Sequence, residues 1–107
     1  MRKNLKSGSL STTIKDVTDE NFPTLDQNIP NPFSNETRIG CFIPATAAKA
    51  DLYIYNLSGV QLQQNEIIGK GKQTVTISRY SFEPGMYLYT LVIDGKEVDT
   101  KRMMLTE

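Results

Sequence analysis

The stretch GMYLYTLVIDGKEVDTKRMML, residues 85–105, carries the strongest secondary-structure signal in the chain. Residues 86–93 are apolar or aromatic on both alternating faces, which is typical of a strand in the middle of a sheet. Asp94-Gly95 is the residue pair preferred in a two-residue type I′ turn. Residues 96–105 then read as the returning strand. The stretch therefore predicts a β-hairpin that closes the domain.

The same period of two runs through four earlier segments. These predicted strands cover residues 37–43, 50–55, 60–68 and 73–77. Turn residues separate them, including Asn56-Leu57-Ser58-Gly59 and Gly69-Lys70-Gly71-Lys72. No stretch after residue 20 has a convincing helical period, and turns recur near the spacing of about 8–12 residues expected of sandwiches. We therefore predict an all-β fold, an antiparallel immunoglobulin-like β-sandwich of about seven strands.

The inward positions of these strands predict the hydrophobic core. That core is expected to contain Ile39, Ile43, Leu52, Ile54, Val75, Ile77, Leu88 and Leu91.

The first third of the chain lacks this alternation. Residues 1–20 are rich in Ser, Thr, Lys and Asp, and we predict a flexible leader or linker there. Three prolines then fix φ within residues 21–33, which predicts an ordered, non-helical strap before the first strand. The domain is therefore expected over residues 21–107. Ser7-Gly8-Ser9 stands where a signal peptide needs an apolar segment, so we expect a longer frame with upstream cargo to supply the export signal.

Composition excludes several function classes. The 107 residues include no histidine and one cysteine, Cys41, which rules out an internal disulfide, Cys/His zinc sets and His-dependent catalysis. Twelve basic residues balance twelve acidic ones, so no basic excess favours nucleic acid. We expect no metal, cofactor, nucleic acid or small-molecule substrate.

The remaining candidates for chemistry have simpler interpretations. We expect Cys41 to be a buried, unreactive thiol and residues 69–72 to be a plain turn. The Asn35-Glu36-Thr37 triplet matches an N-glycosylation motif, which matters only in a glycosylating compartment. The carboxylates should be solvated surface groups: Asp51, Glu66, Glu83, Asp94, Glu97 and Asp99.

Tyrosines occur two apart on two predicted strands, at Tyr53 and Tyr55 and at Tyr87 and Tyr89. If the strands are neighbours, the rings could form an aromatic ladder that stacks on carbohydrate. The alternative is cross-strand packing with the hydroxyl groups at the rim. We favour packing.

Several blocks in order resemble the type IX secretion C-terminal sorting domain of Bacteroidetes. They are residues 25–33, 37–44, 52–59, 83–89, 94–96 and 100–105. The last three are similar to the closing "G-x-Y-x-Y … G … K-R/K-M-x-L" pattern of that family.

This resemblance implies a non-catalytic signal recognised by an outer-membrane translocon, with a sortase-like peptidase joining the cargo to the cell surface. It implies transit through the periplasm to the outer membrane, the cell surface or the medium. The recognition residues it indicates are Gly85, Tyr87, Asp94, Gly95, Lys101, Arg102, Met103, Met104 and Leu105. The motif residues it indicates as structural are Asn28, Pro30, Asn31, Pro32, Phe33, Asn56 and Gly59.

Two questions stay open from sequence. The closing hairpin would offer an exposed edge for strand addition, with Lys101 and Arg102 as charges that the translocon could recognise. Alternatively, Met103 and Leu105 could simply complete the core. The chain could also be a stand-alone immunoglobulin-like spacer or interaction module of a surface protein.

Overall fold

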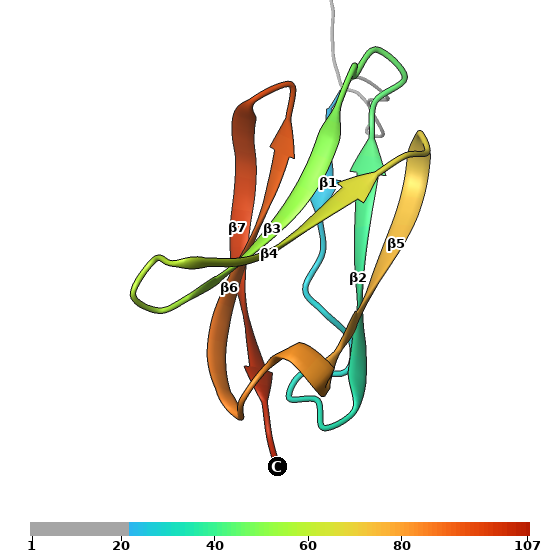
Figure 1. Ribbon diagram of the computed structural model, residues 1–107. Coiled ribbons are helices and arrows are strands. Elements are labelled where there is room, and N and C mark those ends of the chain that lie inside the picture. Colours follow the sequence, from blue (N-terminus) through green and yellow to red (C-terminus); the bar gives the residue numbers. More distant parts are fainter. Residues whose placement is uncertain (1–21) are drawn as a thin grey trace, which may run out of the picture.

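The computed structural model describes residues 22–107, which form two antiparallel sheets packed as a sandwich (Figure 1). Its strands are β1 (Thr24–Leu25), β2 (Glu36–Ile43), β3 (Ala50–Asn56), β4 (Gln61–Ile67), β5 (Gly71–Ser78), β6 (Gly85–Ile93) and β7 (Lys96–Leu105). One sheet has the order β1-β2-β5 and the other β4-β3-β6-β7. A 3₁₀ turn, η1 (Arg79–Ser81), precedes β6. The predicted all-β, immunoglobulin-like sandwich is confirmed, and the predicted leader over residues 1–20 lies outside the described residues.

The core between the sheets contains most of the predicted positions. Ile39, Ile43, Leu52, Ile54, Ile77 and Leu91 are buried, together with Phe33, Tyr89, Met103 and Leu105. Among residues 22–107, no helix is long and apolar enough to cross a membrane.

The prediction was wrong for Leu88 and Val75, which are only half-buried. Leu88 lies opposite Tyr55 on β3 and Arg102 on β7, so it belongs to the outer face of its sheet. Tyr89 takes the inner face instead. Since both faces of residues 86–93 are apolar, alternation alone does not tell which one points inward. Val75 is half-buried because β5 is the edge strand of its sheet.

The β6–β7 hairpin forms as predicted. Asp94 and Gly95 both have positive φ, 51° and 81°, as a type I′ turn requires. The register then pairs Tyr87 with Met103 and Tyr89 with Lys101. β7 is the edge strand of its sheet, and the end of the chain lies beside residues 31–33.

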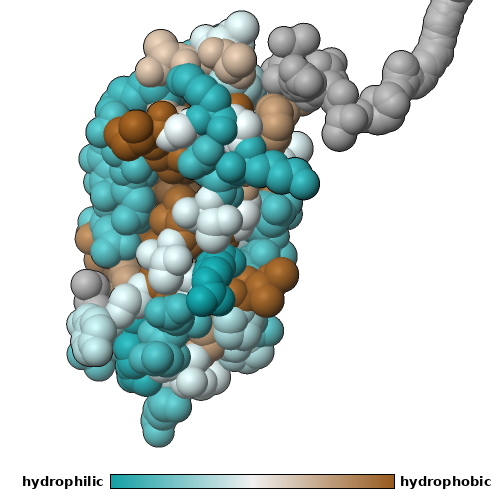
Figure 2. Space-filling view, turned by 90° about the vertical axis from the view of Figure 1, so that its right-hand side faces the viewer, coloured by the Kyte–Doolittle hydropathy of each residue, from teal (hydrophilic) through white to brown (hydrophobic). Residues whose placement is uncertain are grey.

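The connections differ in kind. The β3–β4 hairpin stays within one sheet, and its tip extends well beyond the body of the sandwich (Figure 1). Residues 68–70 instead carry the chain from β4 in one sheet to β5 in the other. On the side where β2 and β5 lie, hydrophobic surface forms a central strip between hydrophilic borders (Figure 2).

Candidate functional site

The predicted recognition residues divide between the inside and the outside of the hairpin. Tyr87, Met103 and Leu105 are buried, and the Tyr87 hydroxyl donates to the Glu83 carbonyl. These three side chains therefore belong to the core and are inaccessible in the folded domain. Met104 is 37% exposed, so this part of the predicted set lies within reach of a partner.

The two adjacent cations point in different directions. Lys101 lies opposite Tyr89 and is half-buried on the inner side of β7, where its Nζ is 3.6 Å from Asp99 Oδ2. Arg102 lies opposite Leu88 and is exposed on the outer face. Of these two cations, only Arg102 presents its side chain to a partner that approaches the outer face.

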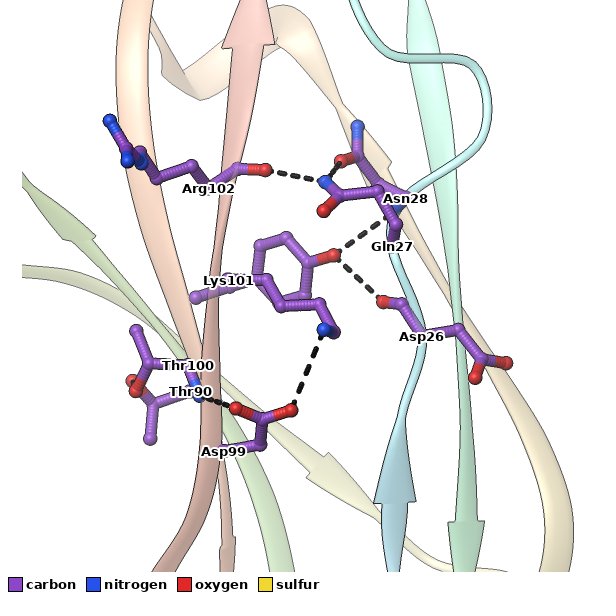
Figure 3. Close-up of polar contacts among 9 residues, drawn as sticks. Asp26, Gln27, Asn28, Thr90, Asp99, Thr100, Lys101 and Arg102 are labelled. Atoms are coloured by element: carbon purple, nitrogen blue, oxygen red, sulfur yellow. Dashed lines mark hydrogen bonds and ion pairs between the residues drawn. The ribbon is translucent and has the colours of Figure 1, made fainter.

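The edge of β7 is partly occupied by the strap, which corrects the expectation of an exposed edge there. The Gln27 side chain donates to the Arg102 carbonyl over 2.6 Å (Figure 3). The Met104 amide donates to Asn31 Oδ1 over 2.9 Å, and its carbonyl accepts from the Phe33 amide over 2.9 Å. Strand addition at this end would compete with these bonds.

The last residues are pinned by the same segment. Phe33 forms a parallel bridge with Leu105, and its carbonyl accepts from the Thr106 amide over 2.8 Å. Because the Phe33 ring is itself 2% exposed, packing and backbone bonds act together here. The strap therefore holds the C-terminal strand as an additional, short parallel neighbour.

A buried polar cluster anchors the strap to the sandwich. The backbone amide of Asn28 donates to the Tyr89 hydroxyl, and that hydroxyl donates to the Asp26 carbonyl, both over 2.8 Å (Figure 3). Asn28 Nδ2 also donates to Thr37 Oγ1 over 3.0 Å, and Thr37 Oγ1 donates to the Pro30 carbonyl over 2.7 Å. Each buried polar group thus has a partner, as burial requires.

Burial also sets the ionisation of this cluster. Desolvation, followed by the nearby carboxylate of Asp26, raises the pKa of Tyr89 to about 12, although the bond from the Asn28 amide acts in the opposite direction. The Tyr89 hydroxyl is therefore neutral at physiological pH and can donate its proton to the Asp26 carbonyl.

The motif residues in the two hairpin turns have structural roles. The Asp94 carboxylate accepts from the amides of Ala48 and Lys49 over 2.9 and 2.8 Å, which ties the β2–β3 connection to the β6–β7 turn. Asn56 Oδ1 accepts from the Val60 amide over 2.9 Å, and Gly59 has a φ of 89° that favours glycine. These residues shape turns.

The other chemical candidates become structural residues. Cys41 is buried, and desolvation followed by Asp26 raises the pKa of its thiol to about 11, so it is a poor nucleophile. Asp51 corrects the expectation of solvated carboxylates. It is 4% exposed, accepts from Gln64 Nε2 over 3.1 Å and lies 3.6 Å from Lys49 Nζ.

The four tyrosines do not form one ladder. β3 and β6 are neighbours, but Tyr87 and Tyr89 face the core whereas Tyr53 and Tyr55 lie on the outer face. The Tyr53 and Tyr55 rings are 6.3 Å apart at 34°. In the Asn35-Glu36-Thr37 triplet, Asn35 is exposed but Thr37 is buried.

Sequence reasoning missed the contacts between the strap and β7. Gln27 and Tyr89 were visible in the motif blocks, but their partners lie 75 and 61–63 residues away in the chain. The available signal was the polar Asn28 among strap prolines, which implied a specific partner for its amide. Within residues 22–107, no group of three or more Cys, Asp or Glu side chains could hold a metal ion.

The family profile described as "Secretion system C-terminal sorting domain" matches residues 28–106. A search of curated proteins gives no significant match. The structure of dimeric latent PorU from Porphyromonas gingivalis is similar with a TM-score of 0.67 and 15% identity, over 90% of this chain and 10% of that chain. The BSP domain of a biofilm associated protein is similar with a TM-score of 0.56 and 10% identity, over 78% and 15% of the two chains.

These structural likenesses show the shared fold alone. The chain spans about a tenth of the PorU chain that it matches.

Proposed function

The chain belongs to the family of secretion system C-terminal sorting domains, and on this premise we propose that a type IX translocon recognises its folded sandwich and exports an upstream cargo. The domain is a type IX sorting signal, and its family is not a catalytic one. The family match over residues 28–106 carries this proposal. Such a signal directs its protein across the outer membrane, to the cell surface or outside.

The finer steps follow from the same proposal. The cargo reaches the periplasm first, the translocon in the outer membrane engages the C-terminal hairpin, and a sortase-like peptidase then removes the domain and anchors the cargo. We assign the sorting unit to residues 21–107. The start of the strap supports this boundary, since β1 already pairs with β2 at Thr24 and Leu25.

We assign direct recognition to the accessible part of the hairpin. Arg102 and Met104 are exposed near the end of the chain, where a partner can reach them whatever cargo precedes the domain. Lys101 contributes charge from the inner side of the strand. Tyr87, Met103 and Leu105 act through the core that holds β7 in place, and Gly85, Asp94 and Gly95 act by shaping the hairpin.

Export of a fused reporter tests the function. A signal-peptide-bearing passive reporter is joined to residues 1–107 and expressed in a type IX-competent host, and its surface fraction is measured by protease accessibility. We expect surface delivery that depends on the host's type IX system. A folded fusion that stays in the periplasm would contradict the proposal and favour a spacer module.

A double variant then tests the assignment of the charges. Lys101→Ser with Arg102→Ser should lower reporter export, because it removes both cations of the hairpin end. Arg38→Ser with Lys72→Ser removes two exposed cations from the opposite sheet and is the matched control. Normal delivery of the first variant would show that the machinery does not recognise these charges.

A further inference from the structure

The outer faces of the two sheets differ in chemistry. On the β1-β2-β5 sheet, three of the four outward pairs of β2 and β5 have no apolar side chain, namely Glu36 with Ser78, Arg38 with Thr76 and Gly40 with Thr74, and the fourth pairs the half-buried Phe42 with the exposed Lys72. On the other sheet, the outward positions near the chain end are apolar. Since soluble antiparallel sheets usually expose a polar face, the apolar face is the exception that calls for an explanation.

The register defines this apolar surface. Tyr55 on β3 lies opposite Leu88 on β6, which lies opposite Arg102 on β7. In the next outward row, Met86 lies opposite Met104. We call these five residues the outer patch. Its apolar members contribute nothing to the sandwich core, because Tyr87, Tyr89 and Met103 fill the inner face at the same level.

The protruding β3–β4 hairpin extends the outer patch with more exposed apolar side chains. Leu57, Val60 and Leu62 are 62%, 55% and 45% exposed, although nothing in the turn geometry requires apolar residues there. The register connects them to the patch, since Gln61 lies opposite Tyr55. A projecting tip with three apolar side chains is suited to insertion into a complementary apolar surface.

We propose that the outer patch and the tip of the β3–β4 hairpin form one docking surface for a protein component of the secretion machinery. This inference rests on the proposed function and extends recognition from β7 to β3, β4 and β6. The occupant is expected to be apolar, with a carboxylate that faces Arg102, because Arg102 is the one charged member of the patch. The position of Arg102 and Met104 within the patch makes it continuous with the recognition residues assigned above.

Reporter export with tip variants provides the first test. Leu57→Ser with Val60→Ser removes two exposed side chains, so the fold should be retained. The surface fraction should fall at least about tenfold, the effect expected from losing a hot-spot contact. Ile68→Ser with Tyr80→Ser is the matched control, because these residues are 78% and 93% exposed outside the surface. Equal delivery of both variants would overturn the tip's role.

Charge reversal provides the second test without touching the core. Arg102→Glu should reduce export, whereas Arg38→Glu on the other sheet should not. Leu88→Ser with Tyr55→Ser should act like Arg102→Glu, and circular dichroism melting confirms that each purified variant is folded. If Leu88→Ser with Tyr55→Ser unfolds the domain, the tip variant and Arg102→Glu alone test the docking surface.

The outcomes separate the two proposals. A wild-type reporter that is not exported contradicts the proposed function. A wild-type reporter that is exported together with the tip and Arg102→Glu variants contradicts only the docking surface. Sedimentation of purified residues 1–107 checks for a second copy as the occupant. A concentration-dependent dimer that the tip variant abolishes would overturn the assignment to the secretion machinery.

Discussion

The two long sides of the sandwich are covered differently. On the side of β7, the strap fills the space between the sheets, with Asn28, Thr37 and Tyr89 almost fully buried and hydrogen-bonded. On the side of β4 and β5, Gln63 and Asn65 occupy inward positions opposite Ile54 and Leu52, yet both remain half-exposed. We call these the strap side and the open side.

The difference shows how each side tolerates polar groups near the core. On the strap side, every buried donor and acceptor depends on a specific partner, so loss of one partner leaves another group unsatisfied. On the open side, water can replace a lost bond. The strap side should therefore carry most of the local stability, and it is the side that positions the end of β7.

Truncation of a core residue on β7 should have the largest effect. Met103 is fully buried, so Met103→Ala should lower the free energy of unfolding by about 2–5 kcal/mol. Val75→Ala, at a half-buried position on the open side, should lower the free energy of unfolding clearly less. Urea denaturation of both variants measures the difference, and equal losses would remove the contrast between the sides.

High pH should destabilise the strap side next. Burial raises the pKa of Tyr89 from 10.0 to about 12 and that of Cys41 from 9.0 to about 11. The unfolded chain therefore loses these protons at lower pH than the folded domain. The stabilisation that the two protonated groups supply is complete below pH 9 and is lost between pH 9 and 12. A shift of this size corresponds to about 2–3 kcal/mol for each group.

Denaturation as a function of pH tests this expectation. Cys41→Ala should flatten the loss between pH 9 and 11, and Tyr89→Phe should flatten it between pH 10 and 12, after a lower starting stability from its two lost hydrogen bonds. An unchanged slope in both variants would mean that other groups cause the alkaline loss.

Removal of the Asn28 side chain should have a somewhat smaller effect. Asn28→Ala removes the side-chain amide that donates to the Pro30 carbonyl and to the buried Thr37 hydroxyl, and it should lower the free energy of unfolding by about 1–3 kcal/mol. Asn65→Ala on the open side should stay within about 0.5 kcal/mol. Hydrogen exchange gives a second readout, since the Met104 and Thr106 amides should lose protection only in Asn28→Ala. Equal exchange of these amides in both variants would show that the Asn28 side chain does not hold β7 in place.

The two sides also differ in how far sequence could predict them. Alternation and Asp94-Gly95 predicted the strands and the closing hairpin because these signals are local. The strap side depends on contacts such as Gln27 with Arg102, 75 residues apart, which no local pattern contains. Leu88 and Asp51 were misassigned for a related reason, because the neighbouring strand decides which face is covered. The assignment of Arg102 and Met104 to recognition stays a prediction from family resemblance.

The smallest stability effect is expected at the two cations of β7. Arg102 forms none of the ion pairs within residues 22–107, and Lys101 is paired at 3.6 Å with an Asp99 that is itself 47% exposed. Lys101→Ser with Arg102→Ser should therefore change the free energy of unfolding by no more than about 1 kcal/mol, which urea denaturation measures.

This small value makes the export experiment interpretable, because a loss of delivery without a loss of stability can be assigned to recognition. The two single variants refine the comparison. Lys101 faces the strap side, so Lys101→Ser should account for most of any change in stability, while Arg102→Ser should leave it unaltered. A loss well above 1 kcal/mol in Lys101→Ser would instead make Lys101 a structural member of the strap side, and only Arg102 would then remain as a charge available for recognition.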